Sequence, residues 1–73
     1  MPHITLNVYS GKKSKVLEEM AQKVRDSLVG EPWGMKPSDI SVSVAEYAAD
    51  DFQNEVHKKL ENETLYISSE YIK

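Results

Sequence analysis

The residue of this sequence that first suggests acid–base chemistry is a proline. Pro2 stands directly after Met1, at the start of the alternating stretch PHITLNVY. Within a chain, proline has no N–H and would donate nothing to a sheet at this position. If Met1 is removed, Pro2 becomes a free secondary amine that can take up a proton and return it. The rest of the chain then decides whether a site surrounds that nitrogen.

The proton affinity of such an amine suits general base catalysis. A general base works best when its pKa lies near the operating pH. An exposed α-amino group has a pKa of about 7.7–8.0, and the secondary amine of proline should lie somewhat higher. An apolar pocket or a neighbouring cation would lower this pKa toward neutrality, because both disfavour the charged form.

Two cations follow the same stretch, in the segment GKKS. Lys12 and Lys13 indicate either a solvated basic turn before a helix or a site for an anionic group. A phosphate-binding P-loop is excluded, because Leu6 stands where its first glycine is required and Lys13 where its Ser or Thr is required. A metal site is not expected either, since the chain has no cysteine and its two histidines are far apart in sequence.

The length of the chain bears on its assembly. Seventy-three residues make one domain, residues 1–73. A chain of this size buries only about 60% of its unfolded surface, so its own core is marginal. Small domains are usually stabilised by disulfides, metals or oligomerisation. With the first two excluded, we expect a homo-oligomer.

Charge and hydropathy exclude several classes of protein. The net charge of −3 argues against a nucleic-acid binder, which normally carries a basic face. No apolar run approaches the roughly 20 residues that span a bilayer. The alternating N-terminus does not resemble a signal peptide. We therefore expect a cytoplasmic protein that contacts neither nucleic acid nor membrane.

The periodicity of apolar residues predicts an α/β chain. Residues 2–9 alternate as a strand, residues 13–29 have the spacing of an amphipathic helix, and residues 40–47 alternate again. A second, shorter helix follows, capped by Asp50 or Asp51, and the stretch at 64–68 is either a short third strand or an extended tail. Ser10 or Ser14 is expected to cap the long helix.

A helix between two strands predicts a right-handed βαβ unit with parallel strands. Such a unit leaves the second face and both edges of its sheet open. Pairing with another subunit into a larger sheet would cover them. Trp33, Tyr66 and Tyr71 are candidates to cover the open face or to line the interface.

These features together resemble the tautomerase superfamily. The residues that carry the likeness are MPHI, the glycine–lysine turn, a helix of about sixteen residues and the strand ISVSV. The chain is most similar to the small proteins like 4-oxalocrotonate tautomerase, in particular to the short dimeric tautomerase-like proteins of bacteria. The likeness covers residues 2 to about 56, whereas residues 61–73 have no clear counterpart.

The resemblance implies a fold, a reaction and a set of roles. The fold is a βαβ protomer that assembles as a dimer, the form we expect, or as a trimer of dimers. The reaction is the cofactor-free enol–keto tautomerisation of 2-oxo acids, with Pro2 as general base. Lys12 falls where the family often has an arginine that binds the substrate carboxylate. Phe52 matches a bulky residue that walls the pocket.

One residue, Ser41, differs from the pattern of the tautomerases that the sequence resembles. Well-characterised members carry an arginine where this chain has Ser41, and serine cannot bind a second carboxylate in the same way. We therefore expect a monocarboxylate substrate, such as phenylpyruvate enol. Two alternatives stay open: a catalytically weak or inactive member of the fold that serves as an oligomeric binding module, and an interaction module that uses the aromatic loop and tail.

Overall fold

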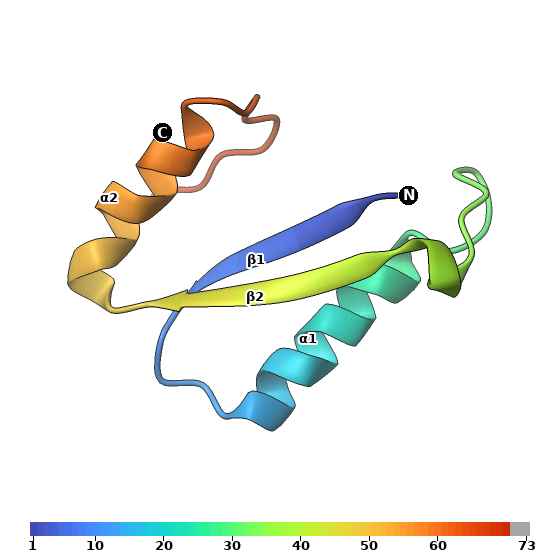
Figure 1. Ribbon diagram of the computed structural model, residues 1–73, viewed down its shortest axis with the longest axis horizontal. Coiled ribbons are helices and arrows are strands. Elements are labelled where there is room, and N and C mark those ends of the chain that lie inside the picture. The colour runs from blue at the N-terminus through green and yellow to red at the C-terminus, as the bar shows by residue number, and fades with distance from the viewer. Residues whose placement is uncertain (71–73) are drawn as a thin grey trace.

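The structure is a computed structural model that describes residues 1–70, so Tyr71 lies outside the described residues. The elements follow in the order β1 (His3–Tyr9), α1 (Ser14–Ser27), a short 3-10 turn at Pro37–Asp39, β2 (Ser41–Tyr47) and α2 (Ala49–Leu60). The predicted α/β class and the βαβ order are confirmed. Figure 1 shows the two strands side by side, with α1 and α2 on different sides of them.

The sheet has two parallel strands in a simple register. His3 pairs with Ser41, and the pairing runs without interruption to Tyr9 and Tyr47. Even-numbered residues of both strands are largely apolar, whereas the odd-numbered residues carry most of the polar groups. The alternation of residue types therefore gives the sheet one apolar and one mostly polar face.

Helix α1 packs mainly against β2. Among the described residues, the buried hydrophobic side chains are Leu17 of α1, Ile40 just before β2 and Val56 of α2. Ile4, Leu6 and Val8 of β1 are only half-buried. The apolar face of β1 is thus incompletely covered within a single chain.

Helix α2 packs against the ends of both strands at Tyr9 and Tyr47 and partly covers the second sheet face, which sequence reasoning left open. Phe52, Val56 and Leu60 recur every four residues; Val56 is buried and the other two are half-buried. This apolar stripe is therefore the packing face of the helix.

The predicted helix caps are wrong. Lys13 occupies the N-cap position of α1 and Ala48 that of α2, and neither makes a side-chain capping bond. Ser14 is already the first residue of α1, while Asp50 and Asp51 lie in the first turn of α2. Acidic residues in a first turn still stabilise a helix through its dipole.

The segment at 61–70 continues from α2 as an exposed arm, and the stretch at 64–68 forms no strand. Figure 1 shows this arm extending beyond the end of α2 and turning back beside that helix. Tyr66 and Ile67 are 91% and 88% exposed. None of the helices in residues 1–70 has the length and apolar character needed to cross a membrane.

Candidate functional site

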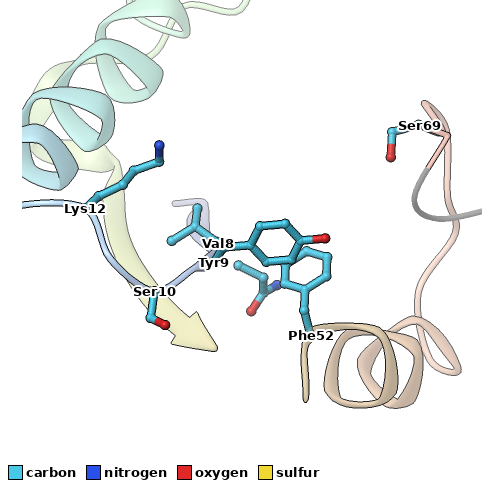
Figure 2. Close-up of a pocket in the computed structure, with 7 residues that line it drawn as sticks. Val8, Tyr9, Ser10, Lys12, Phe52 and Ser69 are labelled. Carbon is cyan, nitrogen blue, oxygen red and sulfur yellow. The ribbon is translucent and has the colours of Figure 1, made fainter. Parts of the chain in front are cut away.

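A mainly apolar pocket lies where β1 ends. It has a volume of about 310 Å³ and is lined by residues 7–10 of the strand end, by Lys12 of the following turn, by Phe52 of α2 and by Ser69 of the arm. Figure 2 shows Lys12 on one side of this pocket and Ser69 on the other, with the rings of Tyr9 and Phe52 between them. We call it the aromatic pocket.

Three aromatic rings fix the wall of the aromatic pocket. Tyr9 and Phe52 meet edge to face with their centroids 4.6 Å apart, and Tyr47 packs on the same ring at 6.5 Å. Such T-shaped pairs hold each ring in one orientation. They form because the two strands end in register, at Tyr9 and Tyr47, and α2 returns across both ends.

Lys12 provides the positive charge of the aromatic pocket. Its side chain is exposed, and the structure shows no ion pair for it with any of residues 1–70. An ammonium group beside aromatic walls suits a ligand that has a carboxylate and an apolar or aromatic body. Lys12 and Phe52, both predicted from the family resemblance, therefore line one pocket.

Pro2 and Ser41 lie at the opposite end of the sheet. The Ser41 N–H donates to the Pro2 carbonyl at 3.2 Å, so the start of β2 holds Pro2 in place. Pro2 is half-buried, whereas Met1 is fully exposed. The whole of β1, seven residues or about 23 Å of extended chain, lies between Pro2 and the turn that carries Lys12. The four predicted site residues thus form two pairs that do not meet within one chain.

A row of hydrogen-bonded polar groups begins beside Pro2. The ring of His3 contacts the Ser41 hydroxyl through Nδ1 at 2.6 Å and the Ser43 hydroxyl through Nε2 at 3.0 Å. Ser43 in turn contacts the Thr5 hydroxyl at 3.2 Å. We call these four residues the hydroxyl row. The sequence alone did not indicate these bonds.

The hydroxyl row leads into a second hollow, which is lined by polar and charged residues. It has a volume of about 390 Å³ and is lined by His3, Thr5 and Asn7 of β1 and by Lys59 and Glu63 from the end of α2 and beyond. Lys59 donates to Asn7 Oδ1 at 3.2 Å, and its Nζ lies 5.2 Å from the centroid of the Tyr47 ring. We call this hollow the polar pocket.

Sequence reasoning missed several residues of both pockets: Tyr9, Ser69, Thr5, Asn7, Lys59 and Glu63. The odd-numbered polar residues of β1 were a usable signal, because alternate residues of a strand share one face. The pocket residues on α2 and on the arm could not be predicted from such a pattern. Their place in a pocket depends on where the chain returns to the sheet.

Comparison of the chain with protein-family models, with curated proteins and with solved structures found no match. Any functional conclusion therefore rests on the chemistry of the two pockets and on the residues at the ends of β1.

Proposed function

We propose that this protein is a cofactor-independent tautomerase that converts the enols of 2-oxo acids to the keto form. In this proposal Pro2, freed by removal of Met1, is the general base, and a second copy of the chain completes the site. The observation that carries the proposal is the position of Pro2 at one end of β1 and of the aromatic pocket at the other end of the same strand.

The open edge of β1 explains how two copies could join these parts. Pro2 accepts a hydrogen bond from Ser41, and the Ser10 N–H donates to the Tyr47 carbonyl at 2.8 Å. Alternate residues of a parallel strand bond to the same neighbour. The even-numbered residues of β1 therefore face β2, and the odd-numbered ones direct their N–H and C=O groups to the open edge.

Full-length antiparallel pairing of two β1 strands would complete the proposed site. The strand has seven residues with Leu6 in the middle, so full overlap places a two-fold axis at Leu6. That register sets Pro2 opposite the partner's Ser10, next to the partner's Tyr9 and Lys12. Pairing would also add cover to the half-buried row Ile4, Leu6 and Val8.

The chemistry needs one base and one anion-binding group. The neutral amine of Pro2 would take the proton of the enol hydroxyl as the carbonyl forms. The electron pair of the C=C bond would then accept that proton from Pro2 at the neighbouring carbon, which restores the amine. Lys12 of the partner would bind the carboxylate, and the aromatic rings would hold an apolar tail.

The fold also suits the chemical change that Pro2 must undergo. Met1 is fully exposed, so its removal takes no packing from the fold. The bond from Ser41 to the Pro2 carbonyl does not involve Met1, so it would keep the new amine at the start of a rigid strand.

The decisive experiment follows the ketonisation of phenylenolpyruvate by protein whose N-terminus has been checked by mass. Replacing Pro2 by alanine should lower kcat/KM by about 10²-fold or more, the usual contribution of a general base. Pro37→Ala, at an exposed proline outside both pockets, serves as the matched control and should leave the rate unchanged. Equal rates for Pro2→Ala and the wild type would refute the proposal.

A second candidate is a catalytically weak or inactive protein that acts as an oligomeric binding module. The arm exposes Tyr66 and Ile67 almost fully, which favours this candidate. So does Ser41, which stands where the tautomerases that the sequence resembles have an arginine. Exposed apolar residues of this kind are typical of contact surfaces. The absence of a measurable rate with any enol would favour this candidate.

A further inference from the structure

We infer that the polar pocket is a binding site for a small zwitterion of the amino-acid class, a molecule with one carboxylate and one ammonium group. This site adjoins the aromatic pocket, with which it shares Asn7. Its occupation does not depend on the proposed tautomerase activity. The inference rests on how the polar pocket distributes charge and hydrogen-bonding groups along β1.

The lining of the polar pocket holds one positive and one negative group. Lys59 and Glu63 are four residues apart, and among residues 1–70 the structure shows no ion pair for either. With His3 neutral, the formal charges of the lining cancel. A simple anion would meet Glu63 and a simple cation would meet Lys59, whereas a zwitterion can pair with both groups.

Lys59 is held in position before any ligand arrives. Its ammonium group donates to Asn7 Oδ1 at 3.2 Å and lies near the Tyr47 ring. An ammonium group has three N–H donors. Its bond to Asn7 uses one of them, so donors are left for a carboxylate. Holding a long lysine side chain in place reduces the entropy lost when a ligand binds.

The hydroxyl row provides a second donor for the same carboxylate. When Ser41 donates to His3 Nδ1, the Nε2–H of His3 can donate to Ser43 and Ser43 to Thr5. In that arrangement the hydroxyl hydrogen of Thr5 is free to donate into the pocket. A bound carboxylate would therefore favour the His3 tautomer that carries its proton on Nε2.

The size of the polar pocket agrees with this class of ligand. The hollow of about 390 Å³ falls within the usual range of about 300–1,000 Å³ for small-molecule sites. The residues of its strand wall, His3 to Asn7, span four steps of β1, or about 13 Å. A short amino acid that lies extended along the strand fits within this length.

Three probes of matched length test the inference by NMR titration of the full chain. We expect 4-aminobutyrate to shift the amide signals of Thr5, Asn7, Lys59 and Glu63 in a saturable way. Butyrate lacks the ammonium group and butylamine lacks the carboxylate, so each should bind about tenfold more weakly, the effect of losing one charged hydrogen bond. Equal affinity for all three, or no saturable shift with 4-aminobutyrate, would overturn the inference.

Charge-removing variants locate the site. Lys59→Gln should weaken 4-aminobutyrate binding about tenfold, and Glu63→Gln should abolish the preference for 4-aminobutyrate over butyrate. Lys58→Gln and Glu61→Gln remove the same charges from exposed positions outside the pocket and should change neither result. If these controls weaken binding as much as the pocket variants do, the ligand is held by general charge and the inference fails.

The binding experiment and the enol assay test the two proposals independently. A protein that binds 4-aminobutyrate but does not ketonise enols would retain the polar pocket site and lose the proposed function. The opposite result would leave the tautomerase proposal in place and remove this site.

Discussion

At the scale of single residues, Lys12 and Pro2 show that suitable side chains form a site only when the fold brings them together. Lys12 forms no ion pair with residues 1–70 and lies beside aromatic walls. Pro2 has a carbonyl bonded to Ser41 and lies next to an exposed methionine. The two lie at opposite ends of one strand, so their cooperation requires a second chain.

The role of Lys12 can be tested through substrate binding. Lys12→Gln should raise KM for phenylenolpyruvate about tenfold, because the carboxylate loses a charged hydrogen bond. Its effect on kcat should be smaller, since the Pro2 amine is untouched. Lys15→Gln removes an equivalent exposed charge from the first turn of α1 and should leave KM unchanged. An unchanged KM in Lys12→Gln would remove this residue from the site.

At the scale of elements, α2 joins the two pockets. Its Phe52 contributes to the aromatic wall near the start of the helix, and its Lys59 reaches Asn7 near the end. The helix can do both because it crosses the ends of the two strands on the face opposite α1 (Figure 1). Detaching α2 would therefore disturb both pockets at once.

The ring of Phe52 attaches α2 to the strand ends, so its removal should destabilise the protein. Phe52→Ala should lower the free energy of unfolding by about 2–3 kcal/mol, because a half-buried ring with two edge-to-face partners is lost. Asn54→Ala, at an exposed position of the same helix, should change it by no more than about 0.5 kcal/mol. Urea unfolding followed by circular dichroism measures both, and similar values for the two variants would contradict this account.

The turn after α1 allows a separate prediction, which concerns the backbone of Gly30. Gly30 has a φ of 82°, and a Cβ placed there would meet nothing within 4 Å. Gly30→Ala should thus cost about 1–2 kcal/mol from backbone strain alone. Gly30→Asn should cost less, because asparagine adopts this conformation more readily. Thermal unfolding ranks the stability of the wild type and the two variants. A Gly30→Ala variant as stable as the wild type would contradict a positive φ at this residue.

At the scale of the whole molecule, a single chain leaves much apolar surface uncovered. Among the described residues only Leu17, Ile40 and Val56 are buried hydrophobic side chains, while β1 keeps an open edge and a half-buried apolar row. A core this small is typical of chains that associate. The proposed pairing along β1 would enlarge the core and complete the tautomerase site in one step.

A proline scan of β1 tests that association. Thr5 directs its N–H to the open edge, so Thr5→Pro should leave the β1–β2 ladder intact while it blocks pairing between copies. Leu6 directs its N–H to β2, and Leu6→Pro should unfold the chain. Sedimentation should give the wild type about twice the 8.3 kDa chain mass and Thr5→Pro the mass of one chain. A wild-type monomer, or a Thr5→Pro dimer, would rule out pairing through this edge.

The sequence by itself determined the elements and the faces of the strands. Alternation over residues 2–9 and 40–47 and helical spacing over 13–29 lie close to the observed β1, β2 and α1, because these patterns reflect local geometry and burial. The capping residues were misassigned, because α1 and α2 begin after Lys13 and Ala48 without a side-chain capping bond. The resemblance also indicated Lys12 and Phe52, which do line a common pocket.

Only the tertiary structure decided which side chains meet. The return of α2 across the strand ends brings Phe52 to Tyr9 and Lys59 to Asn7, pairs separated by more than forty residues of sequence. The parallel register likewise sets His3 beside Ser41 and Ser43 and so creates the hydroxyl row. These contacts depend on the position of one element relative to another, a quantity that the periodicity of a single segment does not contain.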